Sequence, residues 1–99
     1  MNDNAAAPAE RLSQDVTIVN KKGLHARASA KFVQCAERYT ATITVAKELS
    51  SVGGTSIMGL MMLSAGQGSI IHLTAEGPDA EAALAALVEL ISTRFGEEE

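Results

Sequence analysis

The sequence predicts an α+β domain, a two-layer open-faced sandwich in which helices cover one face of a four-stranded antiparallel sheet. Four short segments alternate apolar with polar residues and are rich in β-branched side chains, which is typical of strands with one buried face. Two longer segments repeat apolar residues three and four positions apart, which is typical of amphipathic helices. A third, shorter helical segment completes the order β-α-β-β-α-β-α. Alternating strands with two long helices favour one covered face and one face open to water.

Composition and charge narrow the class of protein. The 99 residues suit one domain, and a hydrophobic fraction of 46% is enough for one core. The net charge of −4 argues against a nucleic-acid partner, which would require a basic face, and it would suit docking onto a basic partner surface. One cysteine and two histidines rule out an internal disulfide and argue against a structural zinc site, so we expect no metal and no cofactor.

Nothing in the sequence indicates membrane insertion. The first ten residues lack the basic and apolar regions of a secretory signal, and no stretch approaches the roughly 18 apolar residues of a membrane span. We therefore expect a cytoplasmic monomer. Residues 1–13 are predicted to form a flexible N-terminal tail, residues 14–95 a single domain, and residues 96–99 an acidic C-terminal tail.

The strands are predicted from their alternation. They cover residues 15–19, 40–46, 49–52 and 69–75, the third being a short edge strand. His72 would face the open side of the sheet, and we assign it no role. The apolar residues expected to point into the core are Val16, Ile18, Ile43, Val45, Ile71, Leu73 and Ala75.

The helices are predicted from their apolar spacing and end signals. The first covers residues 25–38 and the second residues 57–63, with Thr55 or Ser56 as its cap. The last helix would begin with Pro78 in its first turn, where a missing N–H has no cost. The buried stripes are predicted to be Ser29, Phe32, Val33 and Ala36 in the first helix and Ala80, Ala83, Leu84, Leu87 and Ile91 in the last.

One stretch carries candidate chemistry, the sequence KKGLHARASA at residues 21–30. Gly23 ends an extended segment, so His25 would lie at the start of a helix, where unpaired backbone N–H groups and the helix dipole bind phosphate readily. A neutral imidazole is a good nucleophile, and the guanidinium of Arg27 matches phosphate oxygens. These residues predict that His25 accepts and passes on a phosphoryl group. A turn glycine, a surface histidine and a solvated arginine are the alternative interpretations.

Two motifs resemble the HPr family, the histidine-containing phosphocarrier proteins of the phosphoenolpyruvate-dependent phosphotransferase system. Residues 23–27 read GLHAR, which is similar to the family signature Gly-Leu-His-x-Arg-Pro-Ala. Residues 55–61 read TSIMGLM, which is similar to the family's regulatory-serine segment. The similarity spans residues 14–94, so the predicted domain would be HPr-like.

The resemblance implies a role for each matched residue. His25 would be phosphorylated on Nδ1 by enzyme I, with Arg27 beside the phosphoryl group, and would pass that group to enzyme IIA-type proteins. The chain would therefore be a phosphoryl carrier and a substrate of its partners, not an enzyme. Ser56 would be the residue that an HPr serine kinase/phosphorylase modifies in some members. The docking surface for partner proteins would include Ile57, Met58 and Met61.

At one position the chain departs from the signature, because Ala28 stands where the family has proline. A proline would fix φ in the first helical turn, whereas alanine restores a backbone N–H and loosens the turn. The expected phosphate donors at the helix start are therefore the N–H groups of Ala26, Arg27 and Ala28.

The remaining sulfur-containing side chains are interpreted as packing or docking groups. At least one of Met58, Met61 and Met62 is expected in the core, and the others would stay exposed, where flexible methionines suit a surface that recognises several partners. Cys35 is interpreted as a small packing residue of the first helix.

Two other classes of function fit part of the sequence. A small-molecule-binding regulatory module of the ferredoxin-like or ACT kind also packs helices on an antiparallel sheet, but it would need no special histidine. A paralogue that has lost phosphoryl transfer would act only by binding through its second helix, and the presence of His25 and Arg27 argues against it. Within the carrier hypothesis, both sugar uptake and nitrogen-related regulation fit the sequence.

Overall fold

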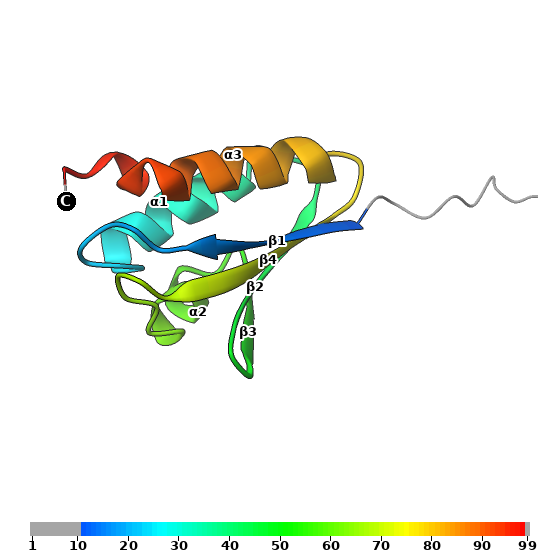
Figure 1. Ribbon diagram of the computed structural model, residues 1–99. Helices are drawn as coiled ribbons and strands as arrows, with labels where there is room; N and C mark the ends of the chain where they lie inside the picture. The colour runs from blue at the N-terminus through cyan, green and yellow to red at the C-terminus, as the bar shows by residue number, and fades with distance from the viewer. Residues whose placement is uncertain (1–10, 99) are drawn as a thin grey trace, which may run out of the picture.

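The computed structural model describes residues 11–98 of the chain (Figure 1). Among the described residues, no helix is long and apolar enough to cross a membrane. The predicted order of elements and the predicted fold class are confirmed. In chain order the elements are β1 (Arg11–Thr17), α1 (Ala26–Ala36), β2 (Thr42–Lys47), β3 (Ser50–Gly53), α2 (Ile57–Met62), β4 (Ile70–Glu76), α3 (Ala80–Ser92) and the 3₁₀ turn η2 (Arg94–Gly96).

The four strands form one antiparallel sheet in the order β1-β4-β2-β3. Helices α1 and α3 lie over one face of this sheet, while α2 packs against α1 and β3 (Figure 1). The other face is open, and on it His72 Nδ1 lies 2.6 Å from Asp15 Oδ1. All the apolar residues predicted to point inward are buried: Val16, Ile18, Ile43, Val45, Ile71, Leu73 and Ala75.

Strand β1 begins four residues earlier than the strand predicted over residues 15–19. Residues 11–13 therefore belong to the sheet and not to the N-terminal tail, while the rest of that predicted tail, residues 1–10, lies outside the described residues. The reason is the partner strand, because β1 pairs with β4 along its whole length, from Arg11 opposite Glu76 to Thr17 opposite Ile70. Pairing extends a strand beyond the residues whose own alternation identifies it.

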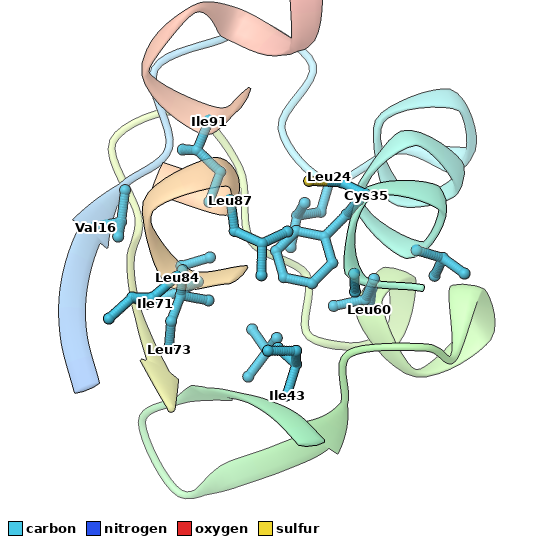
Figure 2. Packing of buried hydrophobic residues seen from close by; sticks show 14 of the residues in the cluster. Val16, Leu24, Cys35, Ile43, Leu60, Ile71, Leu73, Leu84, Leu87 and Ile91 are labelled. Carbon is cyan, nitrogen blue, oxygen red and sulfur yellow. The ribbon is translucent and has the colours of Figure 1, made fainter. Parts of the chain in front are cut away.

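One apolar core fills the space between the sheet and the helices (Figure 2). Helix α2 contributes only Leu60 to it. Cys35 is buried as predicted, and this burial raises the pKa of its thiol, although the positive charge of Arg38 acts in the opposite direction. The predicted helix stripes are buried throughout: Ser29, Phe32, Val33 and Ala36 in α1 and Ala80, Ala83, Leu84, Leu87 and Ile91 in α3.

The last helix starts later than predicted, so the placement of Pro78 in its first turn is wrong. Helix α3 begins at Ala80 with Asp79 as its N-cap residue, and Pro78 precedes the cap. The Asp79 side chain does not cap the helix. Its Oδ2 instead accepts a hydrogen bond of 2.7 Å from the backbone N of Thr40, so this carboxylate ties the start of α3 to the segment before β2.

Residues 96–98 fold back onto the domain, which corrects this part of the predicted acidic tail, while residue 99 lies outside the described residues. After α3 the backbone takes φ values of 61° at Arg94 and 54° at Phe95 and turns sharply. The Phe95 side chain is only 1% exposed, so its burial holds this turn against the core. The turn brings Glu97 to the loop before α1.

Candidate functional site

The candidate site is built around the start of α1. His25 is the N-cap residue, and its carbonyl accepts the first α-helical hydrogen bond, from Ser29 N at 2.8 Å. The N–H groups of residues 26–28 precede that first bond, as they do at the start of any α-helix. The predicted position of His25 at a helix N-terminus is therefore confirmed.

Burial narrows the set of backbone donors that a ligand could reach. Ala26 and Arg27 are exposed, but Ala28 has no exposed surface and packs in the core. The expectation that the Ala28 N–H is one more phosphate donor is not supported by this geometry. Of these three residues, only Ala26 and Arg27 have exposed surface.

Gly23 fixes the loop that leads into the helix. Its φ is +66°, and a Cβ at this position would lie 2.3 Å from the carbonyl oxygen of Ala65. The neighbouring Leu24 N donates a 2.9 Å hydrogen bond to that same oxygen. A side chain at residue 23 would break this close contact, so the glycine is needed for both its conformation and its size.

The imidazole of His25 is held from one side by Glu97. His25 Nε2 lies 2.6 Å from Glu97 Oε2, and the other oxygen of this carboxylate, Oε1, accepts a 3.1 Å hydrogen bond from Asn20 Nδ2. Asn20 is fully buried and also donates to the carbonyl of Gly23 at 2.9 Å. Within residues 11–98, the second ring nitrogen of His25, Nδ1, makes no hydrogen bond.

The electrostatics of this contact favour an ionised carboxylate. Burial by itself would raise the pKa of the Glu97 carboxyl. The hydrogen bonds from His25 and Asn20, together with the electrostatic attraction of Lys31 and of His25 whenever its ring is protonated, outweigh that effect and hold the pKa below its usual range. Glu97 therefore presents a full negative charge to the ring at neutral pH.

A shallow cavity of about 400 Å³ opens beside His25. It carries more positive than negative groups, although the net charge of the whole chain is −4. The positive groups around this cavity match an anionic ligand or an acidic surface, whereas the net charge of the whole chain matches a basic one. The ionisable groups that line the cavity are Lys21, Lys22, His25, Arg27, Lys31, Glu97 and Glu98.

Arg27 lies on the rim of this cavity, two residues from His25 as the sequence requires. Its side chain is exposed, and within the described residues its guanidinium makes no hydrogen bond or ion pair. A guanidinium that is not held by such contacts can turn toward an incoming phosphoryl group.

Ser56 and the apolar side chains of α2 form a second part of the site. Ser56 caps the helix, since its Oγ accepts a 2.9 Å hydrogen bond from Gly59 N, so of the two predicted caps it is Ser56 and not Thr55 that acts. The expectation that at least one methionine of α2 lies in the core is wrong, because this helix of six residues buries only Leu60. The exposed large side chains are Ile57, Met58, Met61 and Met62, with 39%, 68%, 40% and 76% of their surface accessible.

These two parts of the site are joined on the surface. A smaller depression of about 270 Å³ is lined by both His25 and Met61, so the rim of the histidine site runs into the apolar side chains of α2. We call the four side chains Ile57, Met58, Met61 and Met62 the apolar patch. Met61 is therefore the member of the apolar patch that lies beside His25.

The sequence analysis singled out His25 and Arg27 as candidates but did not include Asn20 and Glu97, which the structure places in contact with His25 and with the loop before α1. Asn20 and Glu97 are far apart in the sequence. Glu97 belongs to a run of glutamates, which is typical of a solvated tail. The buried Phe95 two residues earlier is the one local signal that the chain turns back at this point.

Comparison with known proteins decides the family. The family model described as "PTS HPr component phosphorylation site" matches residues 12–93. The chain belongs to the HPr family. It is 54% identical over 86 residues to the phosphocarrier protein HPr of Pseudomonas aeruginosa, an alignment that covers 86% of this chain and 96% of that relative. It is 49% identical over 88 residues to the phosphocarrier protein HPr of Cupriavidus necator, covering 89% and 99% of the two chains.

Solved structures of the HPr family agree with this assignment. The crystal structure of HPr-C-His from Thermoanaerobacter tengcongensis superposes with a TM-score of 0.85 at 46% identity, covering 89% of this chain and 99% of that one. Members of this family are phosphocarrier proteins of the phosphotransferase system. The alternative of an ACT-type regulatory module is excluded by this match.

Proposed function

We propose that this HPr-family chain accepts a phosphoryl group on His25 Nδ1 from enzyme I and passes it to enzyme IIA-type proteins. One observation carries the proposal: Nε2 of the ring is held by Glu97 at 2.6 Å, while within residues 11–98 Nδ1 makes no hydrogen bond, at a helix start beside a positive cavity. The N–H groups of Ala26 and Arg27 and the Arg27 guanidinium are the groups that would surround the phosphoryl oxygens.

The transfer step needs no group beyond these and the partner. The lone pair of Nδ1 attacks the phosphorus of a phosphohistidine on enzyme I, the N–P bond of the donor breaks, and its electron pair returns to the donor nitrogen. The same exchange in the opposite sense delivers the group to the acceptor. Catalysis would consist of positioning and charge stabilisation shared across the transient interface.

The test is phosphorylation by enzyme I with labelled phosphoenolpyruvate, followed by mass spectrometry. We expect acid-labile label on the wild type and none on His25→Ala. His72→Ala is the matched control. His72 lies on the open face of the sheet, so this variant should still be fully labelled on His25. Label that persists in His25→Ala contradicts the proposal, and a wild type that binds enzyme I without becoming labelled supports a paralogue that has lost transfer.

The apolar patch is proposed as the docking surface for both partners. Its support is the exposure of four large apolar side chains on one short helix, next to the depression shared by His25 and Met61. Met58→Ser should weaken binding to enzyme I in titration calorimetry without changing the unfolding temperature by more than about 2 °C, because the side chain is already exposed. An unchanged affinity would remove Met58 from the docking surface.

Ser56 is proposed as a regulatory phosphorylation site. Ser56 is an exposed residue, and a dianion at this helix start would be tolerated by α2 while adding negative charge beside the apolar patch. Incubation with an HPr serine kinase/phosphorylase and ATP should label the wild type but not Ser56→Ala. The absence of label on wild type would leave Ser56 with its capping role alone.

Two narrower questions belong to the same proposal. Parallel phosphorylation rates with a sugar-type and a nitrogen-type enzyme I decide between the two branches of the phosphotransferase system. The prediction that the carrier is a monomer is tested by sedimentation at the concentrations used for transfer.

A further inference from the structure

The C-terminal turn has a backbone conformation that needs an explanation. Arg94, Phe95 and Gly96 follow one another with positive φ values of 61°, 54° and 77°. Two of these residues carry side chains, for which the left-handed region is unfavourable. A turn of this kind persists only where surrounding contacts hold it.

Three contacts hold the turn. The Phe95 ring is 1% exposed in the core, the Phe95 carbonyl accepts a 2.6 Å hydrogen bond from Lys31 Nζ in α1, and Arg94 Nη1 donates a 2.9 Å hydrogen bond to the carbonyl of Glu98. The turn is therefore fixed to both the core and α1, on either side of Glu97.

The turn brings the Glu97 carboxylate into hydrogen-bond contact with the half-buried His25 and the buried Asn20. Glu97 Oε2 lies 2.6 Å from His25 Nε2, and Glu97 Oε1 accepts from Asn20 Nδ2 at 3.1 Å. Asn20 is 0% exposed and its amide also bonds to Gly23 O, so the carboxylate is linked through Asn20 to the loop that precedes α1. Both oxygens of Glu97 thus have partners, and the ring is held in one orientation.

We propose that Glu97 is a positioning residue for His25: it holds the ring proton on Nε2, leaves the lone pair on Nδ1 for the phosphoryl group, and balances the positive charge that the ring gains. This inference rests on the proposed function. When Nδ1 attacks, the new N–P bond forms with the proton still on Nε2, so the ring becomes an imidazolium beside the carboxylate. When the phosphoryl group leaves, the electron pair returns to Nδ1 and the ring is neutral again.

The first measurement does not depend on transfer. In nitrogen-15 NMR of the unphosphorylated chain, the His25 Nε2–H should give a proton signal that is shifted downfield and slow to exchange, because it donates to a carboxylate. Glu97→Ala should lose this signal. Glu98→Ala is the matched control, since it removes the neighbouring negative charge of the same cavity and should keep the signal. A signal that is unchanged in Glu97→Ala overturns the proposal.

The second measurement uses enzyme I and labelled phosphoenolpyruvate. For Glu97→Ala we expect the rate constant at saturating carrier to fall about tenfold with KM unchanged, because a hydrogen bond to a charged partner is lost from the reacting ring and not from the docking surface. Glu97→Gln keeps the shape and loses the charge, so its rate should fall between those of wild type and Glu97→Ala. Equal losses in Glu97→Ala and Glu98→Ala would assign the effect to the general charge of the cavity and overturn the proposal.

The two measurements separate this inference from the proposed function. If wild type is not labelled on His25 at all, the carrier function fails while the NMR signal still decides whether Glu97 holds the ring. If wild type is labelled normally and the signal does not respond to Glu97→Ala, the carrier function stands and the positioning role fails.

Discussion

At Gly23, the absence of a Cβ atom determines the geometry of the loop that leads to His25. A Cβ on Gly23 would lie 2.3 Å from Ala65 O, and the backbone there has a φ of +66°. Gly23→Ala should therefore lower the free energy of unfolding by about 2 kcal/mol or more, measured by urea denaturation. Gly66→Ala is the control, because a Cβ there meets nothing within 4 Å, and its effect should stay within about 0.5 kcal/mol. Equal losses in the two variants would contradict the close contact.

The pKa of Glu97 makes a second prediction at the residue scale. Its folded-state pKa lies below the ordinary value of 4.5, so the carboxylate contributes stability that is present above the unfolded pKa and is lost as the pH falls through the folded pKa. The difference in unfolding free energy between wild type and Glu97→Ala should be greatest above about pH 5 and should shrink below about pH 4. Denaturation at a series of pH values measures it, and a difference that grows toward acid would contradict the direction of the shift.

Residues also mark the limit of what the sequence could predict about the site. His25 and Arg27 were identified because the chemistry they carry is local: a nucleophile and a cation at the start of one helix. Asn20 and Glu97 were not, because their contact forms only where the turn at the C-terminus meets the loop before α1. A run of glutamates has the same composition in a tail as in a folded turn, so composition could not distinguish the two.

At the scale of single elements, α2 shows that a short helix can bury few of its side chains. A helix of six residues buries Leu60 and leaves its methionines outside, although their spacing alone would have allowed one of them to face the core. Strand alternation and the long helix stripes were predictable because they repeat. The start of β1 at Arg11 was not, since it depends on the length of its partner β4.

The cap of α2 gives the prediction that belongs to this scale. Ser56 Oγ accepts from Gly59 N at 2.9 Å, so Ser56→Ala should lower the free energy of unfolding by about 1 kcal/mol. Ser56→Asp keeps an acceptor at the cap and should lose less. Thr55→Ala is the control, because within the described residues Thr55 makes no capping hydrogen bond. Thermal unfolding of the three variants measures this order, and an equal loss for Thr55→Ala would contradict the assignment of the cap.

The whole molecule combines a negative net charge with a positive rim around His25. The chain carries −4 overall, yet Lys21, Lys22, Arg27 and Lys31 line the cavity that holds the ring. Opposite charges on separate parts of a small domain orient it during an encounter, and that effect is screened by salt. An acidic or phosphorylated partner site would thus be guided to His25 even though the net charge of this chain would favour a basic surface.

This arrangement predicts how transfer depends on salt. The second-order rate of phosphoryl transfer from enzyme I should fall severalfold between about 0.05 and 0.5 M ionic strength, since the Debye length shrinks from over 10 Å to below 5 Å. Lys22→Gln should lower the rate at low salt and flatten this dependence, because Lys22 lies on the rim. Arg11→Gln removes the same charge from the start of β1 and should leave the slope as in wild type. Because both variants change the net charge equally, an equal effect of the two would mean that net charge, and not the positive rim, governs the encounter.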